Sequence, residues 1–178
     1  KEVLHPLDLT LDCGIYGLLG ENGVGKTTLL RCIAGLYSDY NGSVSFADKA
    51  GKQTGMHYDK IGYLPQEFGG LGELRVNEFL RYFADMKAID KKSADEEISR
   101  ALESVNLTDK GKERVMKLSG GMRRRLGIAQ TLLGHPELIM YDEPTTGLDP
   151  KERLRFQNRG KQGIGCYGNY FYPYRIRY

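Results

Sequence analysis

The sequence contains few cysteines, and none of them are paired. Cys13, Cys32 and Cys166 are the only three, and no two of them form a Cys-x-x-Cys pair. Zinc sites need clustered cysteines, and small disulfide-stapled domains need an even set at regular spacing. Both kinds of stabilisation are therefore disfavoured, and we expect ordinary thiols in a reducing compartment.

Long apolar runs and a strong charge of one sign are absent as well. No stretch reaches the ~20 apolar residues that a membrane-spanning helix needs, and no signal-peptide pattern opens the chain. The formal net charge of +3 is too small to indicate a nucleic-acid partner on its own. We expect a globular protein that would work at a membrane only by docking on an embedded partner.

The composition that is present suits a globular domain with a core. Of the 178 residues, 40% are hydrophobic and 28% are charged, as in one domain with or without a small subdomain. Short or alternating apolar runs predict strands at residues 3–11, 15–19, 43–46, 61–64 and 138–141. Helical spacing predicts helices at 27–36, two within 76–107, and one at 126–133. This order indicates an α/β fold with a helical insert, and after about residue 155 no helical or strand period persists.

A glycine-rich segment between the predicted strand 15–19 and the predicted helix 27–36 fits the pattern G-x-x-x-x-G-K-[ST]. Its glycines let the backbone wrap around phosphates, and the following helix directs its positive end at them. Lys26 would reach the β- and γ-phosphates, and the Thr27 hydroxyl would bind Mg²⁺. The alternative is a glycine-rich turn with an exposed lysine. The candidate nucleotide-binding residues are Gly20, Glu21, Asn22, Gly23, Val24, Gly25, Lys26, Thr27 and Thr28.

Two carboxylates follow the predicted apolar strand 138–141. In phosphate-loop enzymes, an Asp at this position holds Mg²⁺, and we assign that role to Asp142. Glu143 comes one residue later, where a carboxylate would polarise an attacking water as general base. A solvated strand end is the alternative, but the phosphate loop in the same chain makes the catalytic interpretation the stronger one.

Three further motifs follow the phosphate loop in a fixed order. Residues 63–66 (YLPQ) resemble a Q-loop, residues 118–122 (LSGGM) resemble the LSGGQ signature, and residues 142–149 (DEPTTGLD) resemble a Walker B motif with its D-loop. Together they resemble the ATP-binding cassette (ABC) ATPases over residues 3–158. The resemblance implies a P-loop NTPase (RecA-like) core at 1–158 with an ABC-type helical subdomain at about 74–130.

The resemblance also implies roles for residues outside the phosphate loop. Gln66 would contact Mg²⁺ and the attacking water, acting as a catalytic and metal-binding residue. The signature residues would contact the γ-phosphate of ATP held by a second cassette in a head-to-tail dimer, with Asp149 at the interface. A transmembrane permease would be the other partner, placing the chain in the cytoplasm at the inner face of the membrane. The signature residues concerned are Ser119, Gly120 and Gly121.

Two positions depart from the family pattern. Met122 replaces the usual Gln of the signature, a change that we expect to be tolerated. The aromatic residue that stacks on adenine would lie upstream of residue 1. Tyr16 is a poor substitute, because we expect it in the core strand before the loop.

Three arginines, Arg123, Arg124 and Arg125, follow the signature directly. They could contact nucleic acid or phosphate, but a solvated helix face is the interpretation that we favour. No nucleic-acid partner is therefore expected.

The family's switch histidine, which usually lies in a Ser-Thr-His run, has no counterpart after Asp149. The three histidines are His5, His57 and His135. We interpret residues 159–178 as an aberrant tail from a shifted reading frame. One permitted coding of residues 167–178, read one base later, gives an apolar strand followed by Ser-Thr-His. A genuine aromatic and basic tail is the alternative. With the tail as given, we expect nucleotide binding with weak or absent hydrolysis.

Three function classes follow from these observations. The first is the ATP-hydrolysing subunit of a membrane transporter. The sequence around residues 63–66 resembles that of exporter ATPases. The second is a nucleic-acid-associated ABC ATPase, disfavoured because residues 66–119 carry no sustained heptads. The third is a nucleotide-binding chain that is not an active enzyme. The transported substrate and the homo- or heteromeric nature of the dimer do not follow from the sequence.

Overall fold

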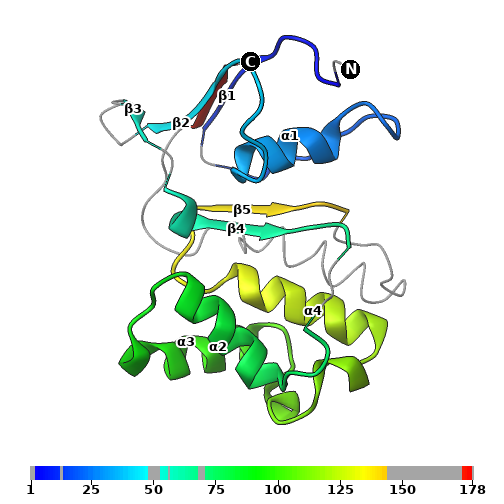
Figure 1. Ribbon diagram of the computed structural model, residues 1–178, viewed down its shortest axis with the longest axis vertical. Helices are drawn as coiled ribbons and strands as arrows, with labels where there is room; N and C mark the ends of the chain where they lie inside the picture. Colours follow the sequence, from blue (N-terminus) through cyan, green and yellow to red (C-terminus); the bar gives the residue numbers. More distant parts are fainter. Residues whose placement is uncertain are drawn as a thin grey trace. The chain divides into compact units, whose positions relative to one another are not determined.

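The computed structural model describes residues 3–12, 14–47, 53–55, 57–67, 71–143 and 174–177 (Figure 1). The chain divides into two compact units, residues 1–58 with 163–178, and residues 59–162. The first unit contains a four-stranded sheet and helix α1, and the second contains a two-stranded sheet and helices α2, α3 and α4. Among the described residues, no helix combines the length and the apolar character needed to cross a membrane.

The sheet of the first unit is antiparallel throughout, with strand order β1-β6-β2-β3. In it, Ile176 pairs with Leu9 on one side and with Val44 on the other. Helix α1 turns Leu29, Cys32 and Ile33 inward. The elements are β1 (Asp8–Leu11), α1 (Lys26–Ile33), β2 (Ser43–Ala47), β3 (Gln53–Thr54) and β6 (Tyr174–Arg177).

The second unit packs three helices and a parallel strand pair around one hydrophobic core. Strands β4 and β5 pair in register from Ile61↔Leu138 to Leu64↔Tyr141, and helix α4 contacts β4, α2 and α3. The α-helices and strands are β4 (Ile61–Leu64), α2 (Val76–Met86), α3 (Lys91–Ser104), α4 (Gly120–Thr131) and β5 (Leu138–Tyr141). Short 3₁₀ helices cover Tyr58–Lys60, Thr108–Lys110 and Val115–Lys117.

A side chain accepts from one open N–H group at the start of each α-helix in the second unit. The Glu78 carboxylate accepts from the Arg75 N–H at 2.7 Å before α2, and the Asp90 carboxylate accepts from the Lys92 N–H before α3. Ser119 caps α4 in the same way. Such caps are typically worth about 1 kcal/mol each, and they fix where each helix begins.

Three side chains also cover the edge of β4 that faces away from β5. The outward carbonyls are those of Ile61 and Tyr63 in β4 and of Pro65 directly after it. They accept from Lys87 Nζ at 3.1 Å, from Gln130 Nε2 at 2.8 Å and from Arg124 Nη1 at 2.8 Å, respectively. Because an open strand edge leaves a row of backbone groups without partners, these donors complete the outer edge of the two-stranded sheet that the described residues form.

Several of the sequence-based predictions are confirmed. Strands 61–64 and 138–141 form with the predicted bounds, and the stretch 76–107 contains two helices. The predicted strand 43–46 and helix 27–36 correspond to β2 and α1. Helix α4 begins at Gly120 rather than at Leu126. Glycine has a low helix propensity, so Gly120 and Gly121 argued against a helix there, but the Ser119 cap starts the helix at this point.

Other predictions are wrong. Residues 15–19 form no strand, and Ile15 and Leu19 are 61% and 92% exposed. A buried strand needs pairing partners, and no described strand pairs with this segment. Of the predicted strand 3–11, only Asp8–Leu11 forms. Conversely, Tyr174–Arg177 forms a strand where no strand period was visible, because β1 and β2 supply hydrogen-bond partners on both edges.

Gly62 provides a direct test of how closely α4 packs on β4. A Cβ atom at this position would lie 2.3 Å from the Thr131 carbonyl oxygen and 2.9 Å from the Thr131 Cβ. We expect Gly62→Ala to lower the free energy of unfolding by roughly 1–3 kcal/mol, because backbone must shift. Urea unfolding followed by circular dichroism measures the change. Gly55→Ala, where a Cβ meets nothing within 4 Å, is the matched control. Equal stabilities of the two variants would contradict this packing.

Candidate nucleotide site

The phosphate-loop candidate in the first unit curls around its own lysine. Lys26 Nζ donates to the carbonyl oxygens of Gly20 at 2.7 Å and Glu21 at 2.6 Å. The loop can close in this way because Gly23 and Gly25 adopt φ angles of +87° and +99°, which glycine alone adopts without strain. The Lys26 ammonium group therefore binds two backbone carbonyl oxygens of its own loop.

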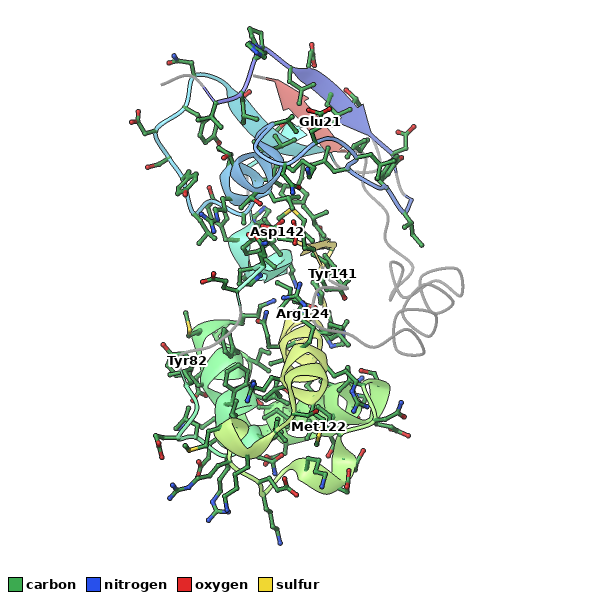
Figure 2. All side chains as sticks on the ribbon, turned by 90° about the vertical axis from the view of Figure 1, so that its right-hand side faces the viewer. Glu21, Tyr82, Met122, Arg124, Tyr141 and Asp142 are labelled. Atoms are coloured by element: carbon green, nitrogen blue, oxygen red, sulfur yellow. The ribbon has the colours of Figure 1, made fainter. Side chains whose placement is uncertain are left out.

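The helix that follows the loop offers an anion-binding end. Gly25 is the N-cap of α1, no side chain caps it, and no acidic residue lies in its first turn. The first N–H groups of such a helix are well placed to bind a phosphate oxygen. Thr27 and Thr28 lie in this turn and are half-buried, whereas Asn22 and Val24 are exposed in the loop. Glu21, whose carbonyl oxygen accepts from Lys26, lies in the same loop and is labelled in Figure 2.

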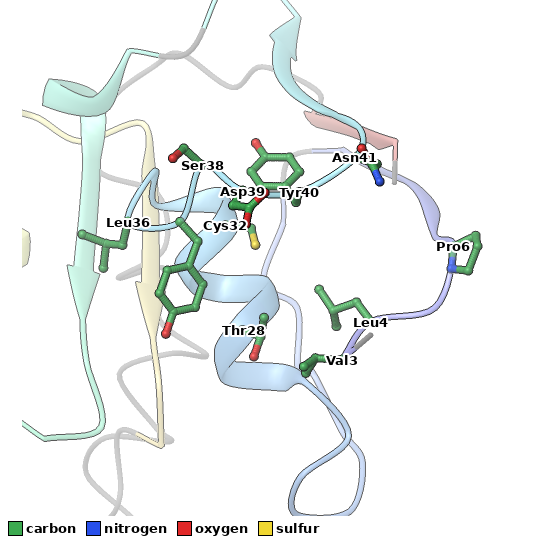
Figure 3. A pocket seen from close by; sticks show the side chains of 11 residues that line it. Val3, Leu4, Pro6, Thr28, Cys32, Leu36, Ser38, Asp39, Tyr40 and Asn41 are labelled. Carbon is green, nitrogen blue, oxygen red and sulfur yellow. The ribbon is translucent and has the colours of Figure 1, made fainter. Parts of the chain in front are cut away.

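A hollow of about 880 Å³ lies between α1 and the N-terminal segment of the first unit (Figure 3). Thr28 and Cys32 line it from α1, and Val3, Leu4 and Pro6 line it from the N-terminal side. Burial raises the pKa of the Cys32 thiol, so Cys32 contributes an uncharged, apolar surface. The volume falls within the range of small-molecule sites in proteins.

The second unit brings two predicted site residues into direct contact. Because β4 and β5 are parallel and in register, the residues after both strands emerge at the same edge. There Gln66 Nε2 donates to Glu143 Oε2 at 3.0 Å. The Asp142 N–H donates to the Leu64 carbonyl at 2.9 Å, and the Asp142 residue is 4% exposed.

Glu143 has an unusual backbone conformation. Its φ is +48°, although it carries a side chain and precedes Pro144. Left-handed backbone is strained for such residues, and the position before a proline favours extended backbone instead. Strain of this kind costs about 1–3 kcal/mol and persists only where surrounding contacts hold it.

The signature residues form the exposed beginning of α4. The Ser119 hydroxyl oxygen accepts from the Met122 N–H at 3.2 Å. Ser119 and Gly120 are exposed and Gly121 is half-buried; a Cβ added at Gly120 would meet nothing within 4 Å. Met122 packs against the hydrophobic core of the second unit, which gives a physical reason for an apolar residue in place of Gln.

Arg124 is a site residue that the sequence interpretation missed. It is only 6% exposed, and its guanidinium donates to four backbone carbonyls that follow β4 and β5, near Asp142 (Figure 2). Burial lowers the Arg124 pKa, while the charges of Asp142 and Glu143 oppose this shift. Helical spacing could have indicated this burial. Ile128 and Thr131 come four and seven residues after Arg124, on the same face of α4, and both are buried.

The prediction of a solvated arginine face is therefore wrong. Arg123 Nη1 donates to the Leu118 carbonyl at 2.9 Å, and Arg125 Nη1 donates to the Val105 carbonyl at 3.3 Å. Long side chains on this helix fold back on nearby backbone instead of extending into water. The prediction of a core position for Tyr16 is also wrong, since Tyr16 is 55% exposed and its hydroxyl donates to the Asp12 carbonyl.

The predicted residues are thus divided between the two units. The phosphate-loop set lies in the first, and Gln66, Ser119, Asp142 and Glu143 lie in the second. Asp149 and the proposed D-loop lie outside the described residues. Within the described part of the chain, no three His, Cys, Asp or Glu side chains gather as a metal-binding group.

Gly25 provides a test of the loop conformation. A Cβ here would lie 2.5 Å from Leu4 Cδ2 at a φ of +99°. We expect Gly25→Ala to weaken the binding of a fluorescent ATP analogue at least about tenfold, because left-handed strain opens the loop. Fluorescence anisotropy measures the affinity. Gly17→Ala, which has open space and no left-handed backbone, should bind as the parent chain does. Unchanged affinity in Gly25→Ala would contradict a role for this loop.

Curated relatives resemble most of this chain. It is 38% identical over 155 residues to "Probable multidrug ABC transporter ATP-binding protein YbhF" of Escherichia coli, covering 86% of this chain and 27% of that protein. It is 36% identical to "Linearmycin resistance ATP-binding protein LnrL" of Bacillus subtilis, covering 91% and 53%. It is 38% identical to "Nod factor export ATP-binding protein I" of a Rhizobium species, covering 88% and 54%. The chain thus spans about a quarter to a half of these relatives' length.

The fold agrees with these similarities. A solved structure from Pyrococcus furiosus, described as an ABC transporter ATP-binding protein, superposes with a TM-score of 0.71 at 28% identity. The match covers 93% of this chain and 80% of that one, so the fold is the P-loop NTPase fold of an ABC ATPase. The family model described as ABC transporter matches residues 4–146. The chain therefore belongs to the ABC transporter family and carries its ATP-binding domain, the part of these transporters that is an ATPase.

Proposed function

We propose that this chain is the ATP-binding and ATP-hydrolysing subunit that drives an ABC transporter, and that the transporter exports its substrate. The observation that carries the proposal is the contact between Gln66 and Glu143 at the ends of two parallel strands. The Gln66 amide holds the Glu143 carboxylate, and the buried Asp142 is the preceding residue in the chain. A carboxylate held in this way is suited to activating a water. The phosphate loop around Lys26 supplies the complementary binding function.

Binding of ATP would use the first unit. Lys26 would exchange its two carbonyl partners for phosphate oxygens, and the N–H groups at the start of α1 would donate to the same phosphates. The conformation of the phosphate loop requires glycine at position 25, because a Cβ there would collide with Leu4.

Each residue proposed for Mg²⁺ carries a donor atom that suits the ion, with Thr27 in the first unit and Gln66 and Asp142 in the second. The predicted ligands Thr27, Gln66 and Asp142 all offer oxygen atoms, which this ion prefers, and Asp142 is a buried carboxylate. One carboxylate with phosphates suffices, because Mg²⁺ in nucleotide enzymes binds few protein ligands. When bound, the ion would neutralise charge on the β- and γ-phosphates.

Hydrolysis would use Glu143 as general base toward a water at the γ-phosphate. Gln66 holds one carboxylate oxygen of Glu143 and so directs the side chain. The strained backbone at Glu143 would serve the same purpose, since functional sites commonly hold such residues in one conformation.

Two partners follow from this proposal. The exposed start of α4, with Ser119 and Gly120, would contact the γ-phosphate held by a second cassette in a head-to-tail dimer. A transmembrane permease would hold the dimer at the inner face of the cell membrane. The export direction rests on relatives named for multidrug transport and for Nod factor export.

A second candidate, nucleotide binding without efficient hydrolysis, is favoured by the tail. Where the shifted reading frame would place Ser-Thr-His, this chain has Phe171, Tyr172, Pro173 and Tyr174. Tyr174 begins β6, a strand paired on both edges. A nucleic-acid-associated ABC ATPase is disfavoured, because all three arginines after the signature bind backbone carbonyls.

Turnover distinguishes the two candidates. The first candidate predicts that the purified chain releases phosphate from MgATP, and that Glu143→Gln lowers kcat at least about 100-fold by removing the base. The second candidate, which follows from the tail, predicts weak or absent release by the chain as given. The exposed Glu103→Gln on α3 is the matched control. A chain carrying the Ser-Thr-His reading of the tail is the third arm. If only that chain turns over, the second candidate holds; if neither does, the proposed ATPase function is wrong.

Dimer formation tests the role of the signature. In a Glu143→Gln background, MgATP should convert monomers into dimers in sedimentation experiments, because bound ATP would lie between two cassettes. Adding Ser119→Arg should abolish this shift, since a bulky side chain would block the exposed start of α4. Glu103→Arg on α3 should leave it intact. A nucleotide-dependent dimer that tolerates Ser119→Arg would contradict the proposed interface.

A further inference from the structure

The Arg124 guanidinium connects the ends of both strands that carry the proposed catalytic residues. Nη1 donates to the carbonyls of Pro65 at 2.8 Å and Gln66 at 3.1 Å. Nη2 donates to the carbonyls of Asp142 at 2.7 Å and Glu143 at 2.8 Å. The planar guanidinium therefore binds two consecutive backbone carbonyls after β4 and two after β5.

These four carbonyls belong to the residues whose relative position decides the Gln66–Glu143 contact. The β4–β5 ladder ends at Leu64↔Tyr141, so regular strand pairing does not extend to Gln66 or Glu143. Beyond the ladder, the Asp142 N–H still bonds to the Leu64 carbonyl. The guanidinium adds a further connection between the two segments, and it does so where Glu143 holds a left-handed backbone.

We propose that Arg124 is a positioning residue, which fixes the backbone of residues 65–66 and 142–143 so that the Gln66 and Glu143 side chains meet. Its effect on turnover rests on the function proposed above, whereas its effect on the backbone does not. All four of these Arg124 bonds end on backbone carbonyl oxygens, so through them Arg124 acts on the peptide groups.

The geometry requires arginine in particular. A guanidinium presents several N–H donors in a fixed plane, whereas a lysine ammonium is a compact charge on a flexible stem. Arg124→Lys would keep the charge and lose the planar fork. Arg125 is a matched control, because it lies on the same helix and also binds carbonyls, those of Val105 and Asn106 beyond the end of α3.

Hydrogen exchange of single amides, followed by NMR on the full chain, separates local positioning from general stability. The Asp142 N–H bonds to Leu64 at the guanidinium end of the strand pair, and the Glu137 N–H bonds to Lys60 at the other end. We expect Arg124→Lys and Arg124→Gln to accelerate exchange at Asp142 at least about tenfold while Glu137 stays within about twofold. Arg125→Gln should change neither amide.

Steady-state kinetics gives the second readout. Arg124→Lys should lower kcat about 10- to 100-fold, with KM for MgATP within about threefold, because ATP binding uses the other unit. Unchanged exchange at Asp142, equal acceleration at Asp142 and Glu137, or kcat unaffected despite faster exchange would each overturn the proposal. A parent chain that hydrolyses no ATP, combined with the local exchange effect, would contradict the proposed function while confirming the backbone role.

Discussion

The parallel pairing of β4 with β5 is the interaction on which the candidate site of the second unit depends. Its register brings the residues after Leu64 and after Tyr141 out at one edge. Two strands alone leave backbone groups exposed on both outer edges, and isolated pairs are marginal. Here Lys87 and Gln130 bind outward carbonyls of β4, and Arg124 binds that of Pro65 directly after it, so side chains satisfy the backbone groups that a further strand would satisfy.

Burying arginine for this purpose has a cost that its contacts offset. The guanidinium keeps its charge in proteins, and removing a charge from water is unfavourable by several kcal/mol unless partners replace the water. Four carbonyl oxygens within 3.1 Å supply those partners for Arg124. Nearby Asp142 and Glu143 add favourable charge, although burial still lowers the Arg124 pKa. The same contacts hold Glu143 in a backbone conformation that it would otherwise avoid.

The sequence predicted those parts of the fold that local pattern determines. Strands β4 and β5 are short apolar runs bounded by Pro65 and Asp142, so their bounds could be read directly. The amphipathic helices α2 and α3 were equally visible in their spacing. Residues 15–19 have the same apolar character but form no strand, because pairing partners decide whether such a run becomes one.

The candidate site was predictable as a set of motifs, but not as an arrangement. Gln66 and Glu143 lie far apart in the chain, and only the register of two strands brings them into contact. Arg124 was hidden in a run of three arginines, because burial of one member depends on the helix face and not on composition. The strand at Tyr174–Arg177 is too short to show a period, and its partners lie more than a hundred residues earlier.

Isothermal titration of the purified chain with MgATP tests the central claim most directly, namely that this chain binds ATP through the loop around Lys26. The account predicts saturable binding with one ATP per chain and its loss in Lys26→Met, with the exposed Lys117→Met binding normally. No binding by the parent chain, or equal binding by Lys26→Met, would contradict the account.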